Sequence, residues 1–390
     1  MIVDGKRELA YIAKITDIQP IEGYDRVSLA TINGGWRVIV SNTDGFNVDD
    51  LCVYFEVDSK VPDTDVRFSF LEKRKYKIKT IKMCKTISQG LVMPLSAFDE
   101  IKNPKEGMPL TDLLGVTYYV AEDNQRKGSG VDPNKKYNSM CARHQKLAKK
   151  KWWRWLMRRT WGKKLLFLFF GRKKDKPKGF PSFVSKTDEE RVENMPWILS
   201  DTEKEWVATE KLDGTSCTYA LQRIKKNKYE FYVCSRNVRQ KDETQECYHD
   251  HNIYWDLAFK YDIEAHLREC LEEHPKWNWV CIQGEGVGSV QGNPLKLADD
   301  DLYVFNFISS EEGRFPSQTA KCIVESWGMK HVPILGIVTL PDNMEEMKAT
   351  AHGKSKVNDK VLREGIVYKD LEGQQSFKNV DPVYLLKKGE

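Results

Sequence analysis

The chain has 390 residues, of which 40% are apolar, so it is long enough for two domains that each bury a hydrophobic core. Its net charge of +5 is unevenly distributed, because residues 135–178 hold 17 Lys and Arg but a single acid, Asp175. No apolar run approaches the roughly 18 residues of a membrane span, and the first residues lack the apolar core of a signal peptide, which excludes an integral membrane protein and predicts a cytoplasmic one.

The excess of positive charge in residues 135–178 predicts a polyanion or an acidic surface as a partner. The nine cysteines are scattered through the chain without a CxxC pair, which indicates reduced thiols. The cluster Cys247–His251 contains metal-ligating residue types, but its spacing matches no common zinc site. We therefore interpret this cluster as a solvated loop.

Residues 1–125 have the pattern of a small β-barrel, in which short runs of strand-forming residues alternate with turns such as Asn33-Gly34-Gly35. The runs are Ala10–Ile15, Val27–Ile32, Trp36–Val40, Cys52–Val57 and Ile87–Leu91, with a less regular basic segment at Tyr76–Lys82. This region resembles an OB-fold, a barrel that binds single strands through a basic groove. We expect Lys75, Lys77 and Lys79 to line that groove, although each of them is equally typical of a solubilised edge strand.

Residues 126–179 are predicted to be a connector that contains the basic, tryptophan-rich run Lys149–Arg159 and the apolar run Leu165–Phe170. On a helix, Ala148, Trp152, Trp155 and Leu156 would form an apolar stripe with basic flanks. One interpretation is a helix on the catalytic domain whose Lys151 and Arg154 contact nucleic-acid phosphates. The others are an interfacial membrane helix and a linker with solvated charges. The nucleic-acid and linker interpretations are preferred here over the membrane one.

The stretch Glu210-Lys211-Leu212-Asp213-Gly214 lies between two predicted strands, Trp206–Thr209 and Cys217–Leu221. Gly214 has no Cβ and therefore permits a tight turn. The turn places the amine of Lys211 where it could attack the α-phosphate of a nucleotide. Attack requires a neutral amine, so we expect desolvation or nearby cations to lower the pKa of Lys211.

Four further motifs follow in order over about 170 residues of the chain. They are Ser235-Arg236-Asn237, Gly284-Glu285-Gly286, Glu364–Lys369 and Ser376-Phe377-Lys378, with the strand-like run Leu302–Ile308 between the second and the third. Each motif is weak alone, but their common order makes coincidence improbable. Together with Lys211 they resemble the motifs of covalent nucleotidyltransferases, and the whole chain resembles ATP-dependent RNA ligases of the branch with an N-terminal OB-fold.

The resemblance implies a role for each motif residue. Lys211 would carry the AMP, Glu210 would read the adenine amino group, and Phe305 would stack on the adenine. Arg236 would hold the ribose or the 5′-phosphate, Glu285 the ribose hydroxyls or a metal-bound water, and Glu364 a divalent metal. Lys369 and Lys378 would neutralise the α-phosphate in the transition state. Ligases usually have Asp where this chain has Asn306, so a metal or substrate role does not carry over to that position.

Two features select RNA ligases within the superfamily. DNA ligases and capping enzymes usually have Arg at the position of Ser216, and they usually carry an OB domain after the last lysine motif. Here 12 residues follow Lys378, too few for a barrel. The alternatives are a non-catalytic RNA-binding protein on a ligase fold and a ligase that seals nicks in DNA or mixed duplexes.

The expected fold is α+β: an OB-like barrel in residues 1–125, the connector 126–179, and a nucleotidyltransferase domain in residues 180–390. The resemblance implies an ATP-grasp-like domain of antiparallel sheets with flanking helices. It also implies ATP and Mg²⁺ or Mn²⁺ as cofactors, and RNA with 3′-hydroxyl and 5′-phosphate ends as substrate, with single strands and nicked duplexes both left open. A monomer is expected.

Overall fold

The computed structural model describes residues 2–3, 6–32, 34–118, 147, 149–170, 179–225, 228–240 and 252–388. Residues 1–119 and 178–390 form one compact unit, and residues 120–177 form another. Ala148 and the cluster Cys247–His251 lie outside the described residues. Within the described part of the chain, no helix has both the length and the apolar content needed to cross a bilayer.

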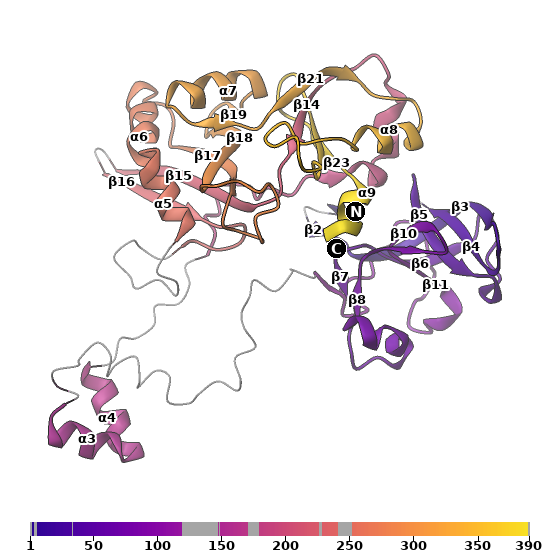
Figure 1. The fold of residues 1–390 in the computed structure, drawn as a ribbon, viewed down its shortest axis with the longest axis horizontal. Helices are drawn as coiled ribbons and strands as arrows, with labels where there is room; N and C mark the ends of the chain where they lie inside the picture. The colour runs from indigo at the N-terminus through magenta and orange to yellow at the C-terminus, as the bar shows by residue number, and fades with distance from the viewer. Residues whose placement is uncertain are drawn as a thin grey trace. The chain divides into compact units, whose positions relative to one another are not determined.

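The first domain is a curled sheet organised around one long strand, β3 (Ala10–Ile21) (Figure 1). The first half of β3 pairs with β6 (Leu51–Phe55) and the second half with β4 (Tyr24–Ile32), with a register shift after Ile15. Because an irregular register bends a strand, β3 serves both sides of the barrel. The order is β11-β6-β3-β4-β5, with β5 at Trp36–Ser41 and β11 at Leu91–Pro94.

Strand β6 and the first four residues of β3, Ala10–Ala13, are buried on both faces, which explains why these stretches are almost continuously apolar. Tyr11 and Tyr54 point into the barrel beside Trp36, while Ile12 and Phe55 pack under the 3-10 helix η2 (Val66–Arg74). This region confirms the expected OB-fold. Shorter elements complete it: β1 (Ile2–Val3), β2 (Lys6–Arg7), η1 (Asn42–Asp44), β7 (Ser59–Lys60), β8 (Lys77–Ile78), β9 (Thr80–Met83), β10 (Thr86–Gln89), η3 (Leu95–Ala97) and β12 (Thr117–Tyr118).

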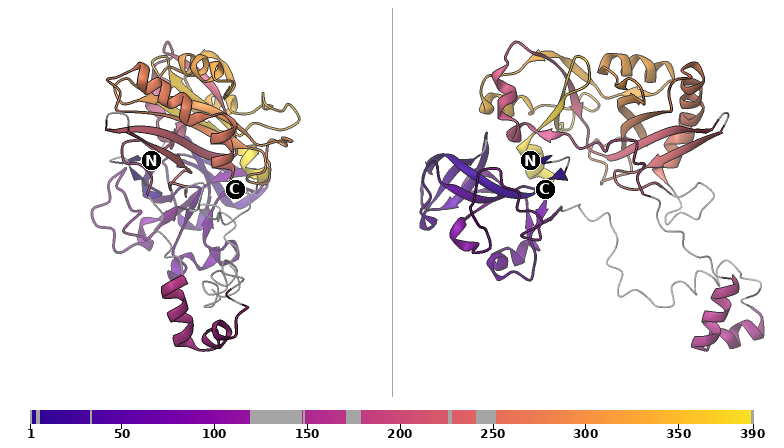
Figure 2. Two further views of the ribbon diagram at one scale, coloured as in Figure 1. Left: turned by 90° about the vertical axis from the view of Figure 1, so that its left-hand side faces the viewer. Right: turned by 180° about the vertical axis from the view of Figure 1, so that it is seen from behind.

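Residues 180–390 contain two mainly antiparallel sheets (Figures 1 and 2). The first has the order β13-β23-β22-β14-β21 and the second β16-β15-β17-β18-β19, with β20 beside β18. The first sheet comprises β13 (Glu190–Arg191), β14 (Glu205–Lys211), β21 (Ile334–Thr339), β22 (Gly365–Asp370) and β23 (Ser376–Val380). The second comprises β15 (Thr215–Lys225), β16 (Lys228–Cys234), β17 (Trp279–Val287), β18 (Asp301–Ser309), β19 (Gly313–Arg314) and β20 (Lys330–His331).

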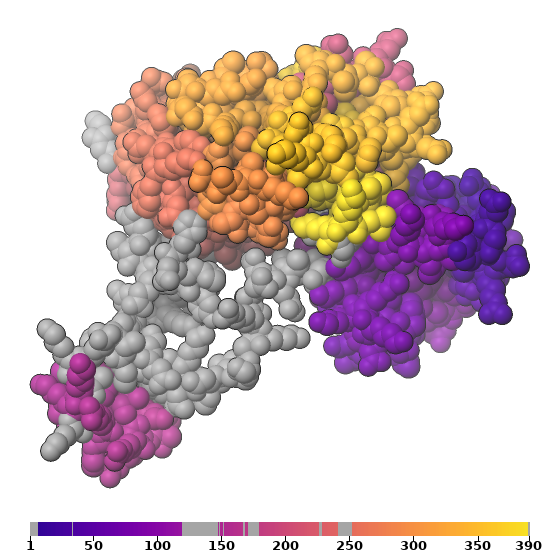
Figure 3. Space-filling view, in the orientation of Figure 1, coloured from indigo at the N-terminus to yellow at the C-terminus, as the bar shows by residue number. Residues whose placement is uncertain are grey.

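Helices cover these sheets, which gives the expected α+β architecture. Leu257, Leu267 and Val324 of α5 (Ile253–Lys260), α6 (Ile263–Glu273) and α7 (Ser317–Ser326) share one core with the second sheet. The core of the first sheet contains Trp206 and Phe377 and is completed by α8 (Met344–Thr350), η4 (Val192–Asn194) and η5 (Pro196–Ser200). The last helix, α9 (Pro382–Lys388), contacts β9 of the barrel (Figure 3).

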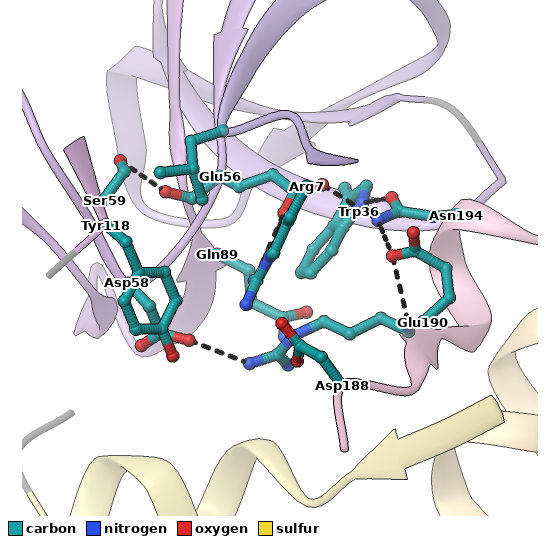
Figure 4. Close-up of polar contacts among 12 residues, drawn as sticks. Arg7, Trp36, Glu56, Asp58, Ser59, Gln89, Tyr118, Asp188, Glu190 and Asn194 are labelled. Carbon is teal, nitrogen blue, oxygen red and sulfur yellow. Dashed lines mark hydrogen bonds and ion pairs between the residues drawn. The ribbon is translucent and has the colours of Figure 1, made fainter. Parts of the chain in front are cut away.

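A buried polar network joins the barrel to the catalytic domain, as Figure 4 shows. The side-chain oxygen of Asn194 accepts hydrogen bonds from Trp36 (2.7 Å) and Tyr11 (3.3 Å). Its amide nitrogen donates to Glu56 (2.8 Å) and Glu190 (2.7 Å). An Asn side chain offers an acceptor and two donors, so this one side chain satisfies groups from both domains.

The second unit contains two helices, α3 (Lys151–Met157) and α4 (Thr160–Phe170), which pack against each other. Trp153 and Leu166 form their small shared core. The side chains of Lys151 and Phe167 lie outside the described part of the structure.

Candidate active site

Lys211 ends β14, the last residue before the chain leaves the first sheet for the second. Its β-partner is Gly365 at the start of β22, so Glu364 lies beside it, and Lys211 Nζ is 2.7 Å from Glu364 Oε2. The link to β15 is three residues long, and a Cβ on Gly214 would lie 2.3 Å from the carbonyl oxygen of Gly286. The turn therefore requires glycine because its backbone lies directly against β17, the neighbour of β15 in the second sheet, a stronger constraint than the predicted one.

Three carboxylates surround the amine of Lys211. Glu364 contacts it, and Glu285 on β17 and Asp213 also act on it electrostatically. Burial lowers the pKa of Lys211, but these carboxylates outweigh burial and raise it above its ordinary value. The expected lowering of this pKa is therefore not found in the ligand-free site, because the motif alone did not reveal how many acids would converge on the lysine.

Burial destabilises the charged form of two of these carboxylates. Burial raises the pKa of Glu285 to about 8, although Lys211 opposes that shift, and burial likewise raises the pKa of Glu364. Asp213 is held by the last helix, since it accepts hydrogen bonds from Tyr384 (2.6 Å) and from Lys388 (2.5 Å). The three acids of the site thus outnumber the two lysines, Lys211 and Lys388, that contact them.

This surplus fits a divalent cation. Mg²⁺ and Mn²⁺ favour carboxylate oxygens, and Mg²⁺ usually takes one or two carboxylates together with waters and substrate phosphates. In the part of the chain that the structure describes, no three His, Cys, Asp or Glu side chains are grouped as a metal site. Glu285 and Glu364 therefore fit an ion that shares its coordination with a phosphate, and not an ion enclosed by protein.

The predicted adenine contacts lie on the far side of Lys211. Glu210 is almost fully buried, and its Oε2 accepts a hydrogen bond from the Lys356 amide at 2.7 Å. Its Oε1 is also buried but accepts no hydrogen bond from any described residue. Phe305 packs in the same apolar cluster as Leu212, next to the nucleophile. A buried acceptor without a donor, near an aromatic ring, suits the amino group of a purine.

Arg236 and Lys378 converge on Asp188. Asp188 Oδ1 lies 3.2 Å from Arg236 and 3.4 Å from Lys378. Burial would raise the pKa of Asp188, but Lys378, Arg236 and Arg7 hold it below its usual range. Burial in turn lowers the pKa of Lys378 to about 8, despite the opposing effect of Asp188. The carboxylate occupies the position at which an anionic phosphate oxygen could bind the two cations.

The OB domain supplies two side chains to this cation cluster. The ring of Tyr118 lies between two guanidinium groups, 5.3 Å from that of Arg236 and 5.4 Å from that of Arg7. Arg7 is itself held by Glu56, 3.3 Å away. Figure 4 shows Arg7 and Tyr118 on the barrel side, facing Asp188.

Lys369 is not part of either group. The register places Lys211, Lys378 and Lys369 on one face of the first sheet, but Lys369 is four residues along the strand from the level of Lys211, or about 13 Å. Its Nζ donates to the Phe305 carbonyl oxygen and, at 2.7 Å, to Asn306 Oδ1. Burial lowers its pKa to about 7. The contact of Lys369 with an α-phosphate stays a prediction.

Asn306 also has a structural explanation. While its oxygen accepts from Lys369, its amide nitrogen donates to Gln283 at 2.9 Å. An ionised Asp could not donate the second bond. The side-chain amide of Asn306 can therefore donate to Gln283 and accept from Lys369 at the same time.

The predicted RNA contacts fall in both units. Lys75 is exposed and follows η2, and Lys77 and Lys79 are half-buried, with Lys77 on β8. Lys151 and Arg154 belong to α3 in the second unit.

Sequence reasoning missed Arg7, Tyr118, Asp188, Tyr384 and Lys388. Arg7 is 229 residues from Arg236, and such a contact leaves no local pattern.

Comparisons with known proteins agree with this geometry. Residues 204–387 match the family model described as RNA ligase, and residues 9–95 match an OB-fold domain model. The chain is similar to the solved structure of Naegleria gruberi RNA ligase with PPi, at 26% identity and a TM-score of 0.74, over 97% of this chain and 98% of that one. A mutant of that ligase with ATP and Mn matches at 26% identity and a TM-score of 0.74, covering 98% and 100% of the two chains. No curated protein matched the sequence.

Proposed function

We propose a role for each residue of the site in one reaction. Residues 204–387 of the chain match the RNA ligase family, and an OB-fold domain precedes them. The protein is an enzyme that joins RNA ends with ATP through lysyl-AMP and RNA-adenylate intermediates. The observation that carries the proposal is the position of Lys211 Nζ, 2.7 Å from Glu364 and surrounded by buried carboxylates at the junction of two sheets.

In the first step Lys211 Nζ attacks the α-phosphate of ATP, and pyrophosphate leaves. The amine must first lose a proton, and Glu364 Oε2 is the acceptor in direct contact with it. Glu210 Oε1 receives the adenine amino group, and Phe305 lies against the base. A magnesium or manganese ion held by Glu285 and Glu364 would supply positive charge that offsets the charge of the phosphates.

In the second and third steps AMP passes to the 5′-phosphate of one RNA end, and the 3′-hydroxyl of the other end displaces it. Arg236 and Lys378 bind the 5′-phosphate in place of Asp188. Arg7 and Tyr118 keep Arg236 oriented, because a stacked guanidinium loses less freedom when it binds phosphate. Catalysis then consists of positioning and charge neutralisation.

The finer assignments complete the proposal. The substrate is RNA with 3′-hydroxyl and 5′-phosphate ends, either single-stranded or nicked in a duplex, and Lys75, Lys77 and Lys79 contact it. The protein is proposed to act as a cytoplasmic monomer. A nick ligase for DNA or mixed duplexes is the competing substrate choice.

A labelling experiment tests the proposal. Wild type, Lys211→Ala and the surface control Lys225→Ala are stripped of bound AMP with pyrophosphate, incubated with α-labelled ATP and Mg²⁺ or Mn²⁺, and separated on a denaturing gel. Label on wild type and Lys225→Ala but not on Lys211→Ala is expected. Sealing of matched RNA, DNA and mixed nicks then ranks the substrates, and faster sealing of DNA than of RNA would contradict the RNA assignment.

A further inference from the structure

The α3–α4 hairpin exposes more apolar surface than it buries. Its core consists of Trp153 and Leu166, with Phe170 packed 5.0 Å from the ring of Trp153. Six large apolar side chains remain at least 40% exposed: Trp152, Trp155, Trp161, Leu165, Leu168 (75%) and Phe169 (72%). Single exposed apolar side chains are common on protein surfaces. Only a contiguous group of them indicates a binding surface.

These exposed side chains form one continuous surface. Trp161, Leu165 and Leu168 follow one another at helical spacings of four and three residues, which places them on one face of α4. The buried residues Gly162 and Leu166 define a different face. Trp155 of α3 lies 5.9 Å from Trp161 in an edge-to-face contact, so the surface, here called the apolar face, continues across both helices.

The charge around the apolar face has one sign. Residues 147–170 contain eight Lys and Arg and no acid. Lys149, Lys150, Arg154, Arg158, Arg159 and Lys164 are exposed, and the guanidinium of Arg159 lies 3.7 Å from the ring centroid of Trp155. A partner of this surface must therefore offer negative charge immediately beside apolar groups.

We propose that the α3–α4 hairpin docks on the surface of an anionic phospholipid membrane. The apolar face enters the boundary between headgroups and acyl chains, tryptophans lie at that boundary, and the lysines and arginines contact the phosphates. Helix α4 has 11 residues and is about 16 Å long, roughly half the thickness of the hydrocarbon core. It therefore lies in the interface.

The aliphatic residues distinguish a membrane from RNA. RNA phosphates would also bind the cations, and Lys151 and Arg154 were predicted as RNA contacts for that reason. Bases stack on aromatic rings, but Leu165 and Leu168 offer no flat ring, and Leu168 is the most exposed of the six. Acyl chains gain from contact with every member of the apolar face.

Co-sedimentation of the full-length protein with vesicles tests this proposal. The vesicles are phosphatidylcholine alone or phosphatidylcholine with about 30 mol% phosphatidylserine. Two variants separate the contributions: Leu168→Ser with Phe169→Ser removes apolar surface without changing charge, and Arg154→Gln with Arg158→Gln and Lys164→Gln removes charge and keeps the apolar face. Self-adenylylation at the wild-type level shows that residues 1–119 and 178–390 of each variant are folded, and an unchanged helical circular dichroism signal shows that the hairpin is intact.

Wild type is expected to bind the anionic vesicles at least about tenfold more tightly than the neutral ones. Each variant is expected to lose about tenfold of that binding. The proposal is overturned if wild type does not sediment with anionic vesicles, or if the serine variant binds them as wild type does. It is also overturned if the glutamine variant loses affinity for single-stranded RNA while its vesicle binding is unchanged, which would identify an RNA surface.

Discussion

The two ends of the β14–β22–β23 sheet bury lysines in opposite environments. At one end Lys211 is surrounded by Glu364, Glu285 and Asp213, which raise its pKa. At the other end Lys369 faces a carbonyl and an amide oxygen, and burial lowers its pKa to about 7. The same residue type on the same face of one sheet thus lies among carboxylates in one place and among uncharged oxygens in the other.

Lys378, between these two ends, provides the strongest test of the comparison. Lys378→Ala should lower the rate of RNA sealing by about 100-fold or more, because it removes a cation aimed at the reacting phosphate. Lys369→Met, the matched buried lysine, should leave sealing within about fivefold of wild type if its role is structural. Single-turnover sealing of a nicked RNA measures both. Equal losses of sealing rate in the two variants would contradict the different roles expected for Lys378 and Lys369.

The pH dependence of the free energy of unfolding tests the environment of Lys369. Because the folded-state pKa of Lys369 is depressed to about 7, the unfolded chain binds more protons than the folded one above that pH, and stability rises with pH there. Between about pH 7 and 9 the free energy of unfolding of wild type should gain about 2 kcal/mol relative to Lys369→Met. Urea unfolding of both proteins measures this gain. A difference that does not change with pH would show that Lys369 is charged when folded.

Substitution of Arg7, the barrel residue next to Tyr118 and Arg236, is expected to have a smaller effect on the reaction. Arg7→Ala removes the guanidinium stacked on Tyr118 and should slow transfer of AMP to RNA by about tenfold while sparing self-adenylylation. Arg67→Ala, another arginine of the barrel paired with Asp65, is the control. Step-resolved assays with ATP alone and with 5′-phosphate RNA measure the two reactions. A parallel loss of self-adenylylation would place Arg7 at the ATP site instead.

The smallest effect is expected at the last helix. Lys388→Ala removes one of two side chains that hold Asp213, and Tyr384 remains in place. Self-adenylylation should slow by about threefold, since a charged hydrogen bond on a partly exposed lysine contributes modestly. Lys387→Ala on the same helix is the control, and an equal loss there would point to helix docking and not to Asp213.

The motifs predicted the two-domain α+β architecture and the place of Lys211, because strand runs and glycine turns are local properties of a sequence. They did not predict that Lys369 and Lys378 serve different purposes. Both follow strand-like residues, and only the pairing of β14, β22 and β23 reveals that Lys378 lies two residues from the level of Lys211 and Lys369 four. The pKa direction of Lys211 was wrong for the same reason, since Glu364 lies 153 residues away in the chain.

The contacts of Arg7, Tyr118 and Asn194 could not be predicted either. Each depends on the docking of two separately folded surfaces, and no periodicity encodes which polar group meets which. The exposed face of α4 was partly visible as Leu165–Phe170, but the choice among its predicted partners depended on knowing which apolar side chains the hairpin leaves uncovered.

The three-residue link Leu212-Asp213-Gly214 has a mechanical consequence. Lys211 ends a strand of the first sheet, Thr215 begins a strand of the second, and Gly214 lies against the Gly286 backbone. So short a tether transmits any rotation of one sheet against the other directly to the lysine. The position of the Lys211 amine is therefore tied to the angle between the two sheets.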